Sequence, residues 1–348
     1  MDSRAKIEGK GPVRRVSRRS RRSRLLPLLG IVAAGAVGAA AVVLLTRPRT
    51  SDLLPERPEG PEGEPDSPSE IAWDAGERRP EAPADDVAVW IAGPAGNLFV
   101  RDGGEEEEDG GVPVLFIHSL GGNGGQWMLQ LDHLRRHRRA AALDLRGHGD
   151  SDPAVDSDYS IEGLAADIAA AADELGLRHF VLVGHSLGAA VAIEYASRHK
   201  ERVAGLLLVD PNGDQTRIPA KQLSPFLKAV KADPLREMDS YFRQILAGGD
   251  PAVAAWVLED LKLTDEGALA GALQAGSRYS PLAALARYTG TKLAILSDMN
   301  RLPFSLHNLV PDLPARFLSG TGHWLMMDSP EPFNHLLDRF LDEVDGQA

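Results

Sequence analysis

The stretch that decides the fold of this chain is Phe180-Val181-Leu182-Val183-Gly184-His185-Ser186-Leu187-Gly188. Its first four residues form an apolar run typical of a buried strand, and a helical pattern follows at 189–198. A sharp turn from strand to helix strains the backbone of Ser186, so glycine must flank it. The turn places the serine hydroxyl at a helix N-terminus, where free N–H groups and the helix dipole stabilise negative charge. The pattern therefore predicts that Ser186 is a nucleophile.

A serine hydroxyl needs a base to become an effective nucleophile. Gly320-Thr321-Gly322-His323-Trp324 lies in a glycine-rich loop between the last predicted strand, 316–318, and the last predicted helix, 332–344. Other histidines, such as His133 and His137, lie among basic residues on predicted helix surfaces. His323 is therefore the predicted base.

Strands and helices alternate around these two motifs. The predicted strands are 87–91, 98–100, 112–118, 140–145, 180–183, 204–209, 293–296 and 316–318, and the predicted helices are 126–136, 161–175, 189–198 and 332–344. Between 212 and 288 the strands stop and helix-like segments take over, at 224–231, 235–246, 251–262 and 266–275. This order predicts an α/β fold with a mostly parallel central sheet, helices on both faces and a helical cap. The core then has two parts, 86–211 and 289–348, and the cap is 212–288.

The charges divide the chain into unlike parts. Residues 1–49 contain 12 Lys and Arg against 2 Asp and Glu, whereas the remainder is strongly acidic. An acidic bulk repels nucleic acid, so no nucleic-acid partner is expected. The chain has no cysteine, which excludes disulfides, thiolate metal sites and a cysteine nucleophile.

Residues 25–45 form an uncharged apolar run, and a helix that spans a bilayer needs about 20 such residues. We predict a basic cytoplasmic arm at 1–24, a transmembrane helix at 25–46 and a disordered Pro/Glu-rich linker at 47–85. The excess of Arg before the run puts the N-terminus in the cytoplasm and the C-terminal bulk in the periplasm or outside the cell. A cleaved signal peptide and a buried helix of a soluble protein are the alternatives, and residues 20–26 weakly resemble a twin-arginine export signal.

Two further stretches directly follow predicted strands, as the serine and histidine motifs do. His118-Ser119-Leu120-Gly121-Gly122 follows the third predicted strand, and its Leu120 N–H is a candidate oxyanion donor together with the Leu187 N–H. The polar stretch 144–151 (DLRGHGDS) follows the fourth strand and is expected to brace loops around the site.

Taken in order, HSLGG, DLRGHGDS, GHSLG and GTGHW resemble the α/β-hydrolase superfamily, in the branch of small esterases and lipases with a helical cap. The resemblance covers about residues 86–345. It implies Ser186 as nucleophile, His323 as base, and the N–H groups of Leu120 and Leu187 as oxyanion donors. Serine rather than aspartate at 186 argues against dehalogenase and epoxide hydrolase activity.

The sequence departs from that family at two places. Ser119 occupies a position that is usually glycine, so the oxyanion loop is expected to differ slightly. After the seventh strand, Asn300 stands where the triad acid is usual, and an amide cannot stabilise an imidazolium by its charge. Asp210, at the end of the sixth strand, is the preferred substitute because a strand end holds a side chain firmly. Asp298 and a Ser–His dyad without an acid stay open.

The expected activity is hydrolysis of a small-molecule carboxylic ester or thioester through an acyl-enzyme, without a metal or organic cofactor and without an obligate protein partner. A cofactor-free haloperoxidase or perhydrolase uses the same triad. A catalytically inactive hydrolase fold that binds a ligand is a third hypothesis, supported by Asn300. A fourth places the function in the basic N-terminal half, as a membrane-surface module.

Overall fold

The structure is a computed structural model and describes residues 79–80, 82–104 and 111–347. The predicted basic arm and transmembrane helix, with most of the predicted linker, lie outside these residues. Within the described part of the chain, none of the helices combines the length and the apolar character needed to span a bilayer.

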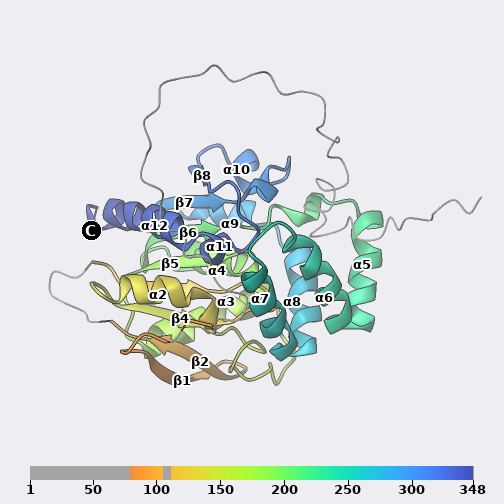
Figure 1. Cartoon of the computed structure of the whole chain (residues 1–348), viewed down its shortest axis with the longest axis horizontal. Helices are drawn as coiled ribbons and strands as arrows, with labels where there is room; N and C mark the ends of the chain where they lie inside the picture. Colours follow the sequence, from red (N-terminus) through yellow and green to blue (C-terminus); the bar gives the residue numbers. More distant parts are fainter. Residues whose placement is uncertain (1–78, 81, 105–110, 348) are drawn as a thin grey trace, which may run out of the picture. The chain divides into compact units, whose positions relative to one another are not determined.

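One eight-stranded sheet forms the centre of the described region, in the order β1-β2-β4-β3-β5-β6-β7-β8 (Figure 1). Its strands are β1 (Val87–Gly93), β2 (Gly96–Asp102), β3 (Val114–Ile117), β4 (Ala140–Leu143), β5 (Phe180–His185), β6 (Val203–Val209), β7 (Thr291–Leu296) and β8 (Ala315–Phe317). The pairs β1–β2 and β2–β4 are antiparallel, and the rest of the sheet is parallel. Every residue of β3, β4 and β5 is buried, as their continuous apolar runs require.

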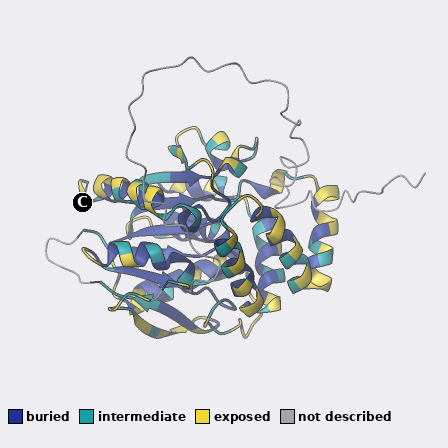
Figure 2. Ribbon diagram, in the orientation of Figure 1, coloured by how far each residue is buried: buried dark blue, intermediate teal, exposed yellow. Residues whose placement is uncertain are grey.

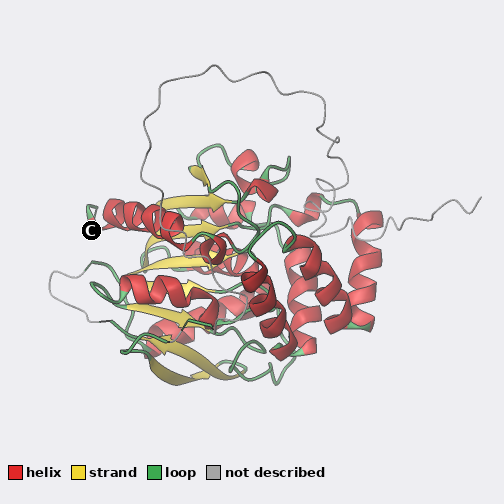
Figure 3. Cartoon of the chain, in the orientation of Figure 1, coloured by secondary structure: helices red, strands yellow, loops and turns green. Residues whose placement is uncertain are grey.

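Helices cover both faces of this sheet (Figure 3). The helices α3 (Ile161–Glu174), α4 (Leu187–Arg198) and α9 (Leu282–Arg287) pack together in series on one face. On the other face α2 (Met128–Leu134) packs against α12 (Pro330–Asp345). Figure 2 shows the sheet as a buried layer between helices whose outer surfaces are exposed. The predicted α/β architecture with a mostly parallel sheet is therefore confirmed.

Four consecutive helices fill most of the segment 212–288. They are α5 (Ala220–Ala232), α6 (Pro234–Ile245), α7 (Pro251–Leu263) and α8 (Glu266–Arg278), and they pack mainly against one another. The sequence pattern missed α9, which follows them, because six residues are too few to show helical periodicity.

The described residues begin at Arg79, before the predicted core boundary at residue 86. Arg79, in the predicted linker, lies with its Nη2 2.8 Å from Oδ1 of Asp260 in α7 and stacks over Trp256. Because the Asp260 side chain is fully buried, a nearby cation offsets the cost of burying its charge. This contact explains why the end of the linker is placed against the cap.

The stretch 144–151 is tied to helix α3 by a buried ion pair. Arg146 donates from Nε to Asp167 Oδ2 at 2.8 Å and from Nη2 to Asp167 Oδ1 at 2.6 Å. Its guanidinium also donates to the carbonyl oxygens of Asp158 and Gly163. These bonds fix the loop that follows β4.

We predict that Asp167→Asn lowers the free energy of unfolding by about 3 kcal/mol, because it leaves the Arg146 charge buried without a counter-charge. The matched control is Asp239→Asn, which removes a pair with the exposed Arg243 on α6 and is expected to cost far less, because water screens that pair. Urea denaturation measures both. Equal losses in the two variants would contradict the importance of the buried pair.

Candidate active site

Ser186 lies at the junction of β5 and α4 in a strained backbone conformation, with φ 53° and ψ −110°. A Cβ at Gly184 would lie 2.4 Å from the carbonyl oxygen of Gly188, and a Cβ at Gly188 would lie 2.4 Å from that of His118. Both positions therefore require glycine. The strand and the helix meet without a loop, as the sequence predicts, but α4 begins directly at Leu187 rather than at residue 189.

His323 and Asp210 are brought together by the folding of distant segments. The Asp210 Oδ2 atom lies 2.7 Å from Nδ1 of His323, and the Asp210 residue is only 1% exposed. Ser297 donates to the same carboxylate from its N–H at 2.8 Å and its Oγ at 2.9 Å. A carboxylate held by several donors stays oriented toward the imidazole, as a charge partner of a catalytic histidine must.

The other two candidates on the loop after β7 take different places. The Asp298 side chain is 45% exposed and pairs with Arg301, and its carboxylate also accepts from Ser319 Oγ at 3.1 Å. Asn300 is buried, and its Nδ2 donates to Asp210 Oδ1 at 3.1 Å and to the Pro211 carbonyl oxygen at 2.9 Å. The structure thus brings Asp210, but not Asp298, to His323, and it uses Asn300 to hold Asp210.

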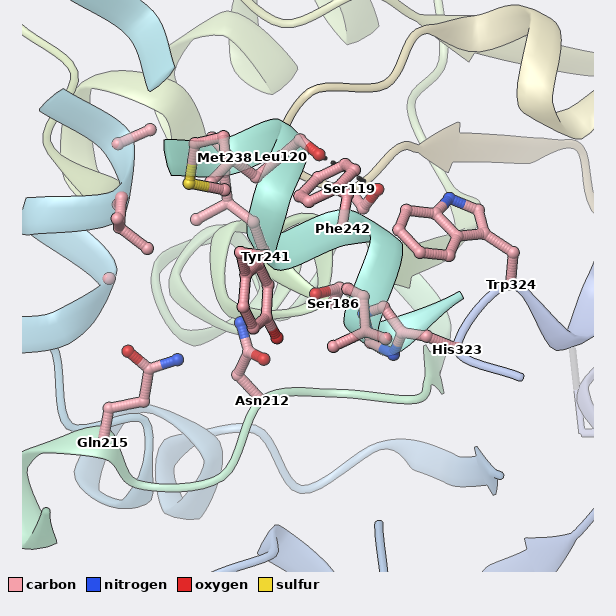
Figure 4. A pocket seen from close by; sticks show the side chains of 15 residues that line it. Ser119, Leu120, Ser186, Asn212, Gln215, Met238, Tyr241, Phe242, His323 and Trp324 are labelled. Carbon is pink, nitrogen blue, oxygen red and sulfur yellow. Dashed lines mark hydrogen bonds between the residues drawn. The ribbon is translucent and has the colours of Figure 1, made fainter. Parts of the chain in front are cut away.

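Leu120 and Leu187, the predicted oxyanion donors, line the same pocket as Ser186 and His323 (Figure 4). Ser119 does not require the left-handed backbone that favours glycine; the residue of this loop with a positive φ is Gly121, at 70°. The expected departure at Ser119 is therefore accommodated without backbone strain.

His118 holds the loop of residues 118–122, which contains Leu120, by two hydrogen bonds of its ring. Its Nδ1 donates to the carbonyl oxygen of Ser119 at 2.6 Å, and its Nε2 accepts from the N–H of Leu145 at 3.0 Å. Only the neutral tautomer with the proton on Nδ1 makes both bonds. Complete burial lowers the pKa of His118 to about 3, so the ring stays neutral. Asp144 holds the end of the same region, because its Oδ1 accepts a hydrogen bond from the N–H of Gly124 at 2.6 Å.

His185 contacts the loop that contains His323, and the sequence patterns did not predict this contact. Its ring is buried, and its Nε2 donates to the carbonyl oxygen of His323 at 2.9 Å. Burial lowers the pKa of His185 well below its usual value, so it acts here as a neutral donor. Its position next to Ser186 was the available signal, since a residue beside the nucleophile is close to the base as well.

A second contact holds the same loop against the cap. Trp324 Nε1 donates to Gln126 Oε1 at 3.1 Å, and Gln126 Nε2 donates to Asp260 Oδ2 at 3.1 Å. Asp260 belongs to α7, so one buried chain of hydrogen bonds joins the cap to the residue after His323. The position of the histidine therefore depends on the cap as well as on the sheet.

The pocket itself is small and mostly apolar, with a cavity of about 40 Å³. Met238, Tyr241 and Phe242 of α6 face Ser186 across it (Figure 4), and two carboxamides, those of Asn212 and Gln215, form part of its wall. Among the described residues, no group of three or more His, Asp and Glu side chains is arranged to hold a metal ion.

Comparisons with known proteins agree with this fold. The model of the alpha/beta hydrolase fold family matches residues 112–262. The chain is 28% identical over 314 residues to the dihydrolipoyllysine-residue acetyltransferase component of the acetoin cleaving system of Cupriavidus necator, a match that covers 84% of this chain and 81% of that protein. It is 30% identical over 249 residues to the component of the same name from Pseudomonas putida. That match covers 67% of this chain and 64% of that protein. An esterase from Exiguobacterium antarcticum has the same fold, with a TM-score of 0.64, 18% identity, and coverage of 74% of this chain and 100% of that one.

Proposed function

Because the chain belongs to the α/β-hydrolase superfamily, we propose that it is a serine hydrolase that cleaves a carboxylic ester or thioester with a short acyl group. The observation that supports this proposal most strongly is the 2.7 Å contact of His323 with Asp210 beside the strained Ser186. The hypothesis of an inactive binding protein depended on Asn300, and the contact of Asp210 with His323 supports an active enzyme instead.

In the proposed mechanism, His323 takes the proton of Ser186 Oγ while that oxygen attacks the carbonyl carbon of the substrate. The carbonyl oxygen becomes negatively charged and accepts hydrogen bonds from the N–H groups of Leu120 and Leu187. The Asp210 carboxylate stabilises the imidazolium that forms on His323.

Collapse of this intermediate breaks the bond to the leaving group, which takes the proton from His323 and departs as an alcohol or thiol. Water then attacks the acyl-enzyme, with His323 again acting as the base. The acid is released, and Ser186 recovers its proton. No step requires a group beyond the residues named here and water.

The size of the cavity supports a short acyl group. Its volume, about 40 Å³, is far below the ~150 Å³ of an engineered protein cavity that binds benzene. Phe242 and Trp324, whose rings are 5.3 Å apart, both line it. The relatives named as acetyltransferases transfer an acetyl group, which is also a short acyl group.

We predict that nitrophenyl acetate and butanoate are hydrolysed at least about tenfold faster, in kcat/KM, than the dodecanoate, because overfilling a packed pocket costs about 1–3 kcal/mol. A fluorophosphonate probe should label the protein but not Ser186→Ala, and that variant should not hydrolyse the esters. Undiminished labelling of Ser186→Ala would refute the nucleophile, and faster cleavage of the dodecanoate would refute the short acyl group.

A second prediction concerns the acid. Asp210→Asn keeps the shape of the side chain but removes its charge, and should lower kcat at least about a hundredfold, by analogy with a loss of about 10⁴ in a serine protease. Asp298→Asn is the matched control and should change kcat less than about threefold, because Asp298 is on the surface. Steady-state hydrolysis of the butanoate measures both. A large loss confined to Asp298→Asn would move the acid to the loop after β7.

We also propose that residues 25–45, outside the described part, hold the hydrolase in a membrane with its catalytic domain on the far side from the cytoplasm. The apolar run and its basic N-terminal flank support this. Protease added to intact cells, or to spheroplasts where an outer membrane exists, should release the catalytic domain. Full-length protein recovered from the cytoplasmic fraction would disprove the anchor.

A further inference from the structure

Two hydrogen-bonded links join the cap helix α7 to the loop of His323. The first link starts at Gly322, the residue before the histidine, whose N–H donates to Asp328 Oδ2 at 2.7 Å. The other carboxylate oxygen, Asp328 Oδ1, accepts from the N–H of Asp250 at 3.0 Å, and Asp250 is the N-cap of α7. A single carboxylate therefore connects the histidine loop to the start of this helix.

The second link starts on the other side of the histidine, at Trp324. The Trp324 Nε1 atom donates to Gln126 Oε1 at 3.1 Å, and Gln126 Nε2 donates to Asp260 Oδ2 at 3.1 Å. Gln126 and Trp324 are each only 1% exposed, so this link lies in a low-dielectric interior where hydrogen bonds are stronger. Asp260 is near the end of α7. Both neighbours of His323 are thus held to α7, one toward each end of the helix.

Helix α7 is itself firmly placed, which makes it a suitable support. Its Val257 and Leu261 side chains are fully buried. Leu261 reaches the loop of residues 118–122, since a Cβ on Gly121 would lie 2.8 Å from Leu261 Cδ1. Arg79 lies 2.8 Å from the second carboxylate oxygen of Asp260. One helix therefore contacts the loop of an oxyanion donor and is linked to both flanks of the histidine.

The proposed mechanism asks His323 to reach two different atoms. The imidazole takes the proton of Ser186 Oγ and later gives it to the departing oxygen, so the ring must be aligned for both transfers. A single hydrogen bond, between Nδ1 and Asp210, does not by itself fix the orientation of the ring. A misplacement of about 1 Å can cost about a hundredfold in rate. Holding the backbone on both sides of residue 323 removes that freedom.

We propose that Asp328 and Gln126 are positioning residues for His323, and that α7 is the common support that holds the imidazole in line for both proton transfers. Neither residue lines the catalytic cavity, so both act through the histidine loop and not on the substrate. The proposal rests on the proposed function, because it requires that His323 protonates a leaving group.

Two butanoate esters with different leaving groups test this proposal. Ethoxide is strongly basic and needs the proton of His323 to depart, whereas 4-nitrophenolate is a stable anion and leaves without it. The measured quantity is the ratio of kcat/KM for ethyl butanoate to kcat/KM for 4-nitrophenyl butanoate. Both values come from one preparation of the full-length enzyme, so the ratio does not depend on the fraction that is folded. Because the acyl group is the same, effects on the oxyanion donors and the acyl cavity cancel.

In Asp328→Asn and in Gln126→Met we expect this ratio to fall at least about fivefold, because a displaced imidazole returns its proton less efficiently. Gln126→Met removes both bonds of the second link without changing a charge, so it separates position from electrostatics.

Asp265→Asn is the matched control, because Asp265 also accepts two hydrogen bonds at the start of a cap helix. Its carboxylate accepts from the N–H of Ala268 in α8 at 2.9 Å and from the Tyr159 hydroxyl at 3.0 Å, not from the histidine loop. The wild-type ratio should be kept in this variant, because Asn caps a helix about as well as Asp does.

An unchanged ratio in both Asp328→Asn and Gln126→Met, whatever the loss in the separate rates, overturns the positioning role and leaves the serine hydrolase mechanism standing. A fall confined to one variant overturns the role of the other residue and of α7 as the common support. An equal fall in Asp265→Asn contradicts the two specific links, because any weakening of the cap would then have the same effect. A wild-type enzyme that cleaves neither ester contradicts the proposed function itself, and the positioning role falls with it.

Discussion

Ser186 adopts a backbone conformation that residues with a side chain rarely take, and the surrounding structure holds it there. Its N–H donates to the carbonyl oxygen of Val209 at 3.0 Å, which ties the turn to β6. Gly184 and Gly188 leave no room for a Cβ, so the strand and the helix pack at the closest distance their backbones allow. The consequence is a hydroxyl at the end of the sheet and at the start of α4. The positions of the histidine, the oxyanion loop and the cap are useful only because this hydroxyl is fixed.

The position of the acid follows from the geometry of neighbouring parallel strands. β6 and β7 are paired in register, with Val209 opposite Ile295, so the segments after both strands begin side by side. A carboxylate from either segment can therefore approach the same histidine. In this chain the acid follows β6, and the segment after β7 supplies donors instead, through Ser297 and Asn300. The amide at 300 donates a hydrogen bond to Asp210, which an ionised carboxylate at that position could not do.

Local sequence patterns predicted the features that depend on neighbours along the chain: the turn at Ser186, the glycine-rich loop of His323 and the alternation of strands and helices. The choice between Asp210 and Asp298 could only be ranked, because spacing does not show that Arg301 holds Asp298 at the surface. The contact of His185 with the His323 carbonyl joins segments far apart in sequence. No periodicity reports such contacts, since they depend on how the elements pack.

In the proposed mechanism Ser186 forms a covalent acyl intermediate. The most direct test is to mix the enzyme with excess nitrophenyl butanoate, to quench with acid within milliseconds, and to map the peptides by mass spectrometry. We predict a butanoyl group on Ser186 in the wild-type protein and none in Ser186→Ala. A butanoyl group on another residue, or turnover without any acylated peptide, would contradict it.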